Sequence, residues 1–392
     1  MRILVLGGAG AMAEVIERDL LESGAEVIVA DRDPKRVEQR VKLLKSRKVT
    51  GKVVDIKAKD FVRQLKSAKA DVLINSTWYE LNMIVMPAAI EAGLHYIDLG
   101  GLYWKTLEQR KLQKQAKAAG VICILGMGST PGIMNVLAAH GAQHFDTIRK
   151  IELRCAGAVL ERVLPSKYFV PPYAIKTVID EVLMPPPVLR NGKIVMEKPI
   201  GTPLSLQFDK PIGKVTGYYT IHSEVATMPE VFRNKGLKEI DFAYAYDPEL
   251  IKIITALSRI GMTSKEKLKI DGCEISPYDF LAEVDKRIPR PEKDTRDIEV
   301  LRVDLWGTYK GKKRFVRVED IAHYLWNKSA GSVETGVPAS IIAQWIAAGK
   351  ISKPGVWAPE EIVDPLPFFR ELKKRKIDVY EQINNSPRKK LN

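Results

Sequence analysis

The feature that most limits the fold of this chain is a repeat of short apolar runs and amphipathic segments over its first 125 or so residues. The apolar runs lack alternating polar positions, which is typical of strands covered on both faces. Because right-handed βαβ crossovers place helices on both faces, the repeat predicts a doubly wound parallel sheet of the α/β class. We expect its strands at residues 3–6, 26–30, 52–54, 71–75, 96–99 and 121–125.

From about Ser129 the pattern changes to longer loops and proline clusters. An Asn191-Gly192 pair predicts a tight hairpin turn, and residues 238–244 and 299–307 have strand character. We therefore expect a second, α+β domain built on a mixed or antiparallel sheet. The predicted division is 1–128, 129–330 and 331–392. The last segment has helical character and is too small to form its own core, so it should pack back on the first domain.

Composition narrows the class of protein. Hydrophobic residues make up 45% of the 392 residues, which excludes disorder as the dominant state. Lys and Arg outnumber Asp and Glu by 62 to 48, but the charges are interleaved, which favours a solvated surface over binding to nucleic acid. No apolar run reaches the roughly 18 residues that suggest a membrane span, so we expect a cytoplasmic protein. The sparse cysteines Cys123, Cys155 and Cys273 support neither disulfides nor structural zinc.

A glycine-rich turn follows the first predicted strand. Gly8, Gly10 and Ala13 fit the three small positions of G-x-G-x-x-G/A, the fingerprint of a Rossmann-type domain. The first position allows the tight turn, the second lets a pyrophosphate approach, and the third lets the helix lie close to the strand. The amides of Ala11, Met12 and Ala13 at the helix start should then bind phosphate.

The next strands supply the other cofactor contacts. Asp31 lies 23 positions after Gly8, close to the ~20 expected for the carboxylate that binds the adenosine ribose. A carboxylate there favours NAD, whereas the adjacent Arg32 could clamp the extra phosphate of NADP. Asp31 could instead only cap the following turn. Two further contacts are expected at strand ends: Asp55, for which turn capping explains the position equally well, and the polar run Asn75, Ser76 and Thr77 beside the nicotinamide.

Together with this fingerprint, several later segments carry a family resemblance. They are Tyr79-Glu80-Leu81-Asn82, His95-Tyr96-Ile97-Asp98-Leu99-Gly100-Gly101, Gly128-Ser129-Thr130-Pro131-Gly132-Ile133-Met134-Asn135, residues 220–229 and Glu334-Thr335-Gly336-Val337-Pro338. With them the chain resembles the saccharopine dehydrogenase-like amino-acid oxidoreductases, and its compact length is most similar to that of the lysine 6-dehydrogenases. Lysine-type members tend to have a histidine after the Asp-Leu-Gly-Gly run, where this chain has Leu102 and Tyr103.

The resemblance implies NAD(P)-dependent oxidoreductase chemistry at the C–N bond of an amino acid. The first expectation is oxidative deamination of L-lysine at its terminal amine. The alternatives are a saccharopine- or carboxynorspermidine-type reductase that reduces an imine, and a cofactor-binding regulator without turnover. An open second sheet also favours a homo-oligomer, with a homodimer as the first expectation.

Such a reaction needs a group that moves the proton of the amine. Asp98 at the end of its strand is one candidate, although capping of the Gly100 turn explains it as well. Tyr79 could donate to the reacting nitrogen or stack on the nicotinamide, or it could simply be packed. His222 lies in a segment in which the resemblance places substrate contacts, and its alternative is a structural histidine.

Substrate anchors are expected among amide and cationic side chains. Asn82 and Asn135 could bind substrate, although asparagine near a helix start is often a cap. Arg154 and Lys176 are candidates for a carboxylate anchor, with surface solvation as the alternative. His140 and His144 have the i, i+4 spacing of metal ligands, but the sequence offers no third ligand beside them, so no metal is expected.

Overall fold

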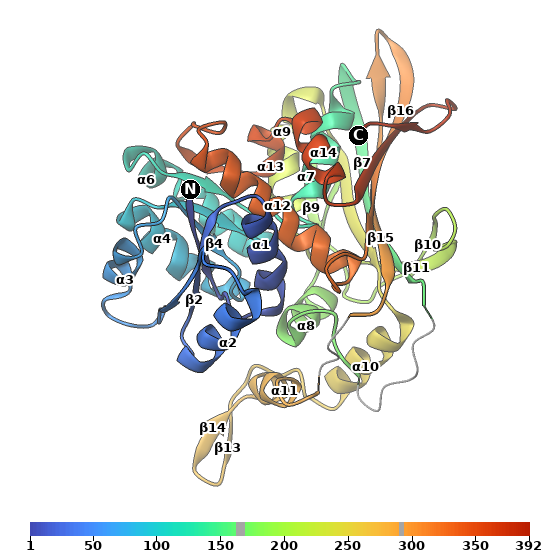
Figure 1. Ribbon diagram of the computed structural model, residues 1–392. Coiled ribbons are helices and arrows are strands. Elements are labelled where there is room, and N and C mark those ends of the chain that lie inside the picture. The colour runs from blue at the N-terminus through green and yellow to red at the C-terminus, as the bar shows by residue number, and fades with distance from the viewer. Residues whose placement is uncertain (162–168, 290–293) are drawn as a thin grey trace.

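The computed structural model describes residues 1–161, 169–289 and 294–392. Their N-terminal part forms a seven-stranded parallel sheet with the order β17-β6-β5-β4-β1-β2-β3 (Figure 1). All six predicted strands are confirmed within a few residues, and the order around β1 is that of a Rossmann sheet. The strands are β1 (Arg2–Leu6), β2 (Glu26–Asp31), β3 (Val49–Val53), β4 (Val72–Asn75), β5 (His95–Asp98), β6 (Ile122–Ile124) and β17 (Gly355–Trp357).

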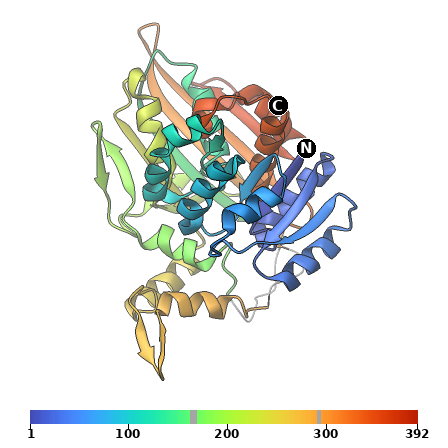
Figure 2. The ribbon, with the colours of Figure 1, turned by 90° about the vertical axis from the view of Figure 1, so that its left-hand side faces the viewer.

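Helices cover both faces of this sheet, as the apolar strands require (Figures 1 and 2). Local sequence sets their ends. Asp33 accepts hydrogen bonds from the amides of Lys35 and Arg36 at the start of α2, and Gly93 ends α4 with φ of 74°. The helices are α1 (Ala11–Glu22), α2 (Pro34–Leu44), α3 (Phe61–Ser67), η1 (Tyr79–Leu81), α4 (Asn82–Ala92), α5 (Leu102–Arg110) and α6 (Gln113–Ala118).

The second sheet of the described residues has ten strands and is mixed, because β12 runs parallel to β7 while the other pairs are antiparallel. The Asn191-Gly192 turn joins β8 to β9 with φ of 50° and 79°, as the sequence predicts. The strands are β7 (Thr147–Val159), β8 (Pro187–Arg190), β9 (Lys193–Met196), β10 (Leu204–Gln207), β11 (Lys214–Tyr219), β12 (Glu239–Ala245), β15 (Asp297–Tyr309), β16 (Lys312–His323), β18 (Ile377–Ile383) and β19 (Lys389–Lys390).

One face of this sheet packs on helices, and a single apolar cluster continues from there into the first domain. A separate arm of α11 and the hairpin of β13 (Leu268–Ile270) and β14 (Cys273–Ile275) projects from the body (Figures 1 and 2). The helices are α7 (Ile133–Ala142), α8 (Ile175–Leu183), α9 (Glu224–Val231), η2 (Arg233–Lys235), α10 (Pro248–Arg259), α11 (Pro277–Asp285), α12 (Ala330–Ala347), α13 (Pro359–Ile362) and α14 (Pro365–Lys373).

The C-terminal segment joins the two domains. Helix α12 packs on α1 so closely that a Cβ at Gly336 would lie 2.7 Å from the Val15 side chain. Buried Arg375 binds buried Asp19 of α1 at 2.7 Å. The sequence predicts helical character for this segment, but the segment also contains three strands. β17 extends the first sheet, while β18 and β19 extend the second.

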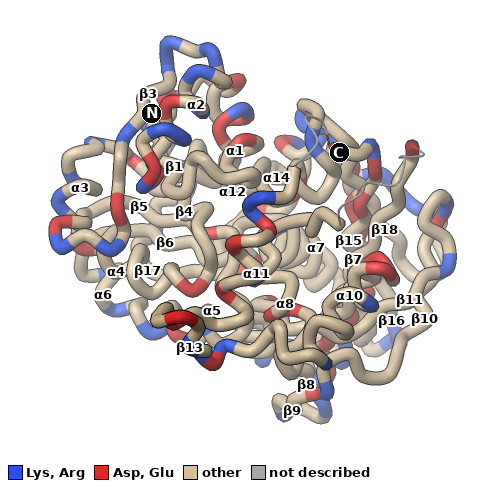
Figure 3. Tube along the Cα trace, turned by 90° about the horizontal axis from the view of Figure 1, so that it is seen from below, with Lys and Arg blue, Asp and Glu red and all other residues tan. Residues whose placement is uncertain are grey.

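The charged residues are spread over both domains, with basic and acidic side chains interspersed (Figure 3). None of the described helices combines the length and the apolar character needed to cross a membrane.

Candidate active site

The glycine-rich turn lies between β1 and α1 and fits a dinucleotide. A Cβ at Gly8 would come within 2.9 Å of the Val5 carbonyl oxygen and the Glu17 carboxylate, so only glycine fits there. Gly10 is the N-cap of α1 and makes no side-chain cap, which leaves the first amides of the helix, at Ala11, Met12 and Ala13, without helical partners. Free amides at a helix start are the site that a pyrophosphate binds.

Two arginines of α2 contact the glycine-rich turn near the predicted ribose site. Asp31 ends β2, half-buried, and Arg32 next to it is exposed. Arg36 of α2 donates to the carbonyl of Ala9 at 2.7 Å, and Arg40 donates to that of Gly10 at 2.8 Å. Sequence analysis missed these two arginines, which α2 brings back over the turn. The sequence signal for them is that Arg36 and Arg40 are four residues apart, on one face of the helix that begins after Asp33.

Asp55 lies after β3, where its carboxylate accepts from the amide of Lys57 at 2.9 Å. This is the turn cap that the sequence also allowed, and its contact with adenine stays a prediction.

The polar run at the end of β4 lies against the glycine-rich turn, and its contact with the nicotinamide stays a prediction. A Cβ at Gly7 would lie 3.0 Å from Thr77 Cγ2 and 3.1 Å from the Ser76 carbonyl. Asn75 accepts from the Thr77 hydroxyl at 2.6 Å, and its amide donates to Asn82 at 2.9 Å. Asn82 in turn donates to the Gly100 carbonyl at 3.0 Å. Asn75 and Asn82 therefore bind each other and hold the sheet edge.

Asp98 is buried at the end of β5 and anchors two turns. Its carboxylate accepts from the amides of Gly126 at 2.7 Å and Gly100 at 3.0 Å, and from the Gln109 side chain at 2.6 Å. Burial raises its pKa, and these hydrogen bonds oppose the rise. These contacts are those of a turn cap, so Asp98 has a structural role and is not assigned a role in proton transfer.

The loop that Asp98 holds reaches across to the second domain. Ser129 donates to Glu334 of α12 at 2.9 Å, and Thr130 donates to Glu224 of α9. Asn135 in the first turn of α7 accepts from the Gly132 amide at 2.9 Å and donates to Glu360 at 2.7 Å. Asn135 therefore shapes the end of this loop as a helix cap.

His222 lies on the far side of the loop, buried between two carboxylates. Its Nδ1 is 3.3 Å from Glu224 and its Nε2 is 3.8 Å from Glu181, and its ring stacks on Phe242 at 3.9 Å. Burial alone would lower the pKa of His222, but Glu224 and Glu181 outweigh it and raise the pKa. The imidazole is thus biased toward its protonated form, as a general acid requires.

These residues belong to a largely buried group of polar and aromatic side chains that we call the polar ring. Glu181 accepts from Tyr246 at 2.8 Å, Tyr246 stacks on Tyr244 at 4.2 Å, and Tyr244 donates to Glu299 at 2.9 Å. Glu334 is buried near them, and burial first, then the charges of Asp320 and Glu299, raise its pKa. The polar ring consists of Glu181, His222, Glu224, Thr130, Ser129, Glu334, Glu299, Tyr244 and Tyr246.

Tyr79 and Lys176 belong to a second cluster. It is built around Asp180, the residue that precedes Glu181 in the chain. The Tyr79 hydroxyl donates to Asp180 at 2.5 Å, and Tyr278 donates to the same oxygen at 2.7 Å. Burial and then Asp180 raise the pKa of Tyr79, so it stays a phenol. Lys176 pairs with Asp279 and lies 4.7 Å above the ring of Trp78. Lys176 is therefore already neutralised by a carboxylate.

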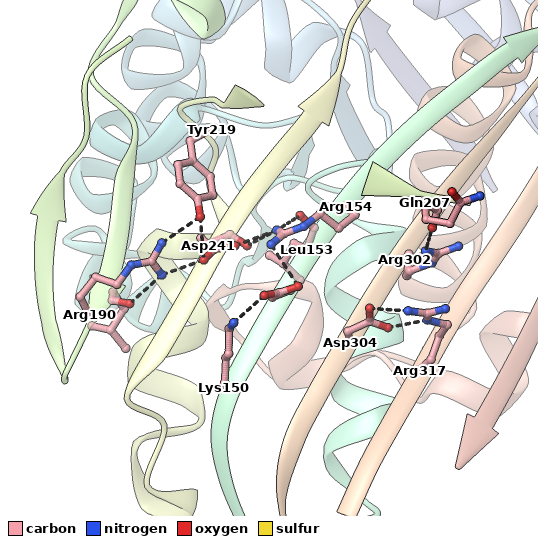
Figure 4. A network of polar contacts seen from close by, with 12 residues as sticks. Lys150, Leu153, Arg154, Arg190, Gln207, Tyr219, Asp241, Arg302, Asp304 and Arg317 are labelled. Carbon is pink, nitrogen blue, oxygen red and sulfur yellow. Dashed lines mark hydrogen bonds and ion pairs between the residues drawn. The ribbon is translucent and has the colours of Figure 1, made fainter. Parts of the chain in front are cut away.

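Arg154 lies away from the polar ring. It alternates with Cys155 along β7, and Cys155 contacts Glu299 of the polar ring, so Arg154 points to the opposite face of the sheet. There it pairs with Asp241 at 2.7 Å and Glu152 at 3.2 Å in a network of strand side chains (Figure 4). The structure thus separates Arg154 from the other predicted site residues, and a carboxylate anchor at this position has no support from its contacts.

The carboxylates of the polar ring are the functional candidates that sequence analysis missed. Glu181, Glu299 and Glu334 come from separate elements, and only the fold brings them together. One signal was available in the sequence: Asp180 and Glu181 interrupt the apolar run Val178-Ile179 and Val182, at positions where a helix buries its side chains.

Comparisons with known proteins agree with this architecture. Residues 3–124 match the saccharopine dehydrogenase NADP binding domain and residues 128–378 the saccharopine dehydrogenase C-terminal domain. Carboxyaminopropylagmatine dehydrogenase of Synechocystis is 24% identical over 98% of both chains. Carboxynorspermidine synthase of Vibrio alginolyticus is 25% identical over 91% of this chain and 87% of its own.

A solved structure shows the same fold over the whole chain. Apo saccharopine dehydrogenase (L-Glu forming) from Saccharomyces cerevisiae superimposes with a TM-score of 0.72 at 17% identity, covering 98% of this chain and 99% of its own. The two family matches span nearly the entire sequence, and the glycine-rich turn fits a nicotinamide dinucleotide. The chain therefore belongs to the saccharopine dehydrogenase family of NAD(P)-dependent oxidoreductases.

Proposed function

We propose that the chain reduces the imine formed between an amine and a carbonyl compound, and so joins the two as a secondary amine. The observation that carries this proposal is the similarity over nearly the whole chain to two proteins whose names denote carboxylated polyamines. This fits the reductive alternative of the sequence analysis better than deamination of lysine.

The polar ring supports a cationic substrate. Glu181, Glu224, Glu299 and Glu334 contribute four carboxyl groups, with Asp320 beside them. Buried oxygens of Glu224, Glu334 and Asp320 have no hydrogen-bond partner among the described residues. Unpartnered buried acceptors are costly, and the N–H donors of an amine or a polyamine would satisfy them.

Condensation and reduction must balance. The amine nitrogen adds to the carbonyl carbon, water leaves, and the imine carbon then accepts a hydride while its nitrogen gains a proton. The reduced nicotinamide supplies that hydride when the cofactor is bound. We assign the proton to His222, whose pKa is raised by Glu224 and Glu181 beside it. Tyr79 positions Asp180 next to Glu181 and moves no proton.

An absorbance assay of the reduced nicotinamide tests the proposal. Amines such as lysine, ornithine, agmatine and short diamines are paired with aldehydes and keto acids, with NADPH and NADH each supplied in turn. The expected result is cofactor oxidation only when both partners are present. Reduction of NAD(P)⁺ by lysine alone would instead support oxidative deamination of lysine. Cofactor binding with no turnover of any pair would point to a regulator.

The preference between NAD and NADP gives a separate prediction. Exposed Arg32 directly follows Asp31 and would suit an adenosine phosphate, whereas Asp31 suits a free ribose. Replacing Arg32 with alanine should weaken NADPH binding by about tenfold or more, because hydrogen bonds to charged groups contribute about 1.5–3 kcal/mol. Binding of NADH should change little. Calorimetry of both cofactors on both proteins is the measurement, and equal losses for NADH and NADPH would contradict it.

A further inference from the structure

His140, His144 and Glu381 form a third cluster, which is separate from the polar ring and from the cluster around Asp180. His140 lies in the last turn of α7, His144 lies in the turn that follows the helix, and Glu381 comes from β18, far along the chain. His140 Nε2 lies 3.0 Å from Glu381 Oε2, and His144 Nε2 lies 2.5 Å from the same oxygen. The fold thus supplies the third side chain that the sequence spacing lacked.

The geometry points to a divalent metal site, zinc first, with His140, His144 and Glu381 as its three protein ligands. One potential ligand atom from each residue lies within 4.8 Å of the other two. Two imidazoles and a carboxylate are a donor set that zinc binds at about 2.0–2.2 Å, which places neighbouring donors about 3.4 Å apart. The present nitrogen-to-oxygen contacts would need to widen by less than about 1 Å to admit the ion.

Two further observations favour a metal over a simple pair of hydrogen bonds. His144 Nε2 is buried and close to Glu381, yet it lies outside hydrogen-bond geometry with any described group. This nitrogen is therefore a buried polar atom without a hydrogen-bond partner among the described residues. The His144 side chain is also 26% exposed, while those of His140 and Glu381 are 7% and 9% exposed, so the cluster lies near the surface on the His144 side. A water molecule can complete the coordination there.

Neighbouring residues hold the His140 ring and the backbone of His144. The His140 ring packs edge-to-face on Phe369 of α14 with centroids 5.4 Å apart, and Arg314 binds the His144 carbonyl at 3.1 Å. Glu381 Oε2 lies within 3.0 Å of the Nε2 atoms of both histidines, so one carboxylate oxygen already faces both imidazoles. A metal here would tie α7 to the C-terminal strand β18 and stabilise the fold.

Zinc binding to the full-length protein tests this inference. The protein is stripped with a chelator, dialysed and titrated with Zn²⁺ by calorimetry, and Co²⁺ is used in parallel as a spectroscopic probe. We expect one equivalent to bind, a visible Co²⁺ band of four-coordinate intensity, and a melting temperature that rises with added zinc. Glu381→Gln and His144→Gln should each weaken binding more than about 100-fold. His323→Gln, at the end of β16, is the matched control and should bind as the wild type does.

The outcomes are decisive even if a variant folds poorly, because the titration of the wild-type protein stands alone. Absence of zinc binding and of any thermal shift in the wild type would show that the cluster is held by hydrogen bonds only. Undiminished binding in folded Glu381→Gln and His144→Gln proteins would place the ion elsewhere. Either result overturns the assignment.

Discussion

Replacing Gly10 with alanine is expected to weaken binding of the nicotinamide cofactor by at least about tenfold, equal to about 1.4 kcal/mol. The new Cβ would lie 2.9 Å from the Gly7 carbonyl oxygen, at the point where the pyrophosphate approaches the helix start. The backbone of Gly10 has φ of −78°, which alanine adopts readily, so the fold should persist. Calorimetry with NADPH measures the loss.

Gly201 offers a matched control for this variant. A Cβ there would lie 2.9 Å from the carbonyl oxygen of Lys198, the same kind of contact as at Gly10, but in the loop between β9 and β10. Gly201→Ala should bind NADPH as the wild type does. If both variants lose the cofactor equally, the effect comes from general destabilisation and the role of the glycine-rich turn is wrong.

Replacing His222 with glutamine is expected to lower kcat for imine reduction by about 10²–10⁴-fold, which is the range for loss of a general acid. Glu181 and Glu224 raise the pKa of His222, so the wild-type rate should fall as the pH rises through that raised value and His222 loses its proton. In His222→Gln this descending limb should disappear. His323→Gln, which has no polar side-chain contact among the described residues, should keep both the rate and the profile.

A variant of Glu224, which lies beside His222, distinguishes a His222 that donates a proton from one with only a structural role. Glu224→Gln removes a charge that raises the pKa of His222, and therefore should shift the descending limb to lower pH without abolishing activity. The groups that face the imidazole are Glu181, Glu224 and the stacked Phe242. A profile that is identical in wild type, Glu224→Gln and His222→Gln would contradict the role of His222.

The first domain could be predicted closely because local signals agree with one another. The strand runs, the cap at Asp33 and Pro34, and the glycine pattern at Gly8 and Gly10 all describe one βα unit, and tertiary structure only extends it. The prediction missed β17, because three residues far along the chain become a strand only through pairing with β6. The same limit explains β18 and β19, which are specified by the edge of a sheet formed elsewhere in the sequence.

The candidate site was less predictable for the same physical reason. Contacts within one strand end, such as Asn75 with Thr77, follow from sequence spacing, whereas their contact with the cofactor stays a prediction. The polar ring joins residues separated by as many as 205 positions, as between Ser129 and Glu334. Asn82, Asn135 and Asp98 illustrate the reverse case, since their types and positions suit either a site or a cap, and only the observed partners distinguish the two.

The reductive joining of an amine to a carbonyl compound is tested most directly by following the hydride into the product. The protein is incubated with an amine, an aldehyde and NADPH that carries deuterium at its reactive carbon, and the products are examined by mass spectrometry. We expect a secondary amine that contains both substrates and one deuterium on the new C–N carbon. Formation of reduced cofactor from lysine and NADP⁺, with no coupled product under any condition, would contradict this account.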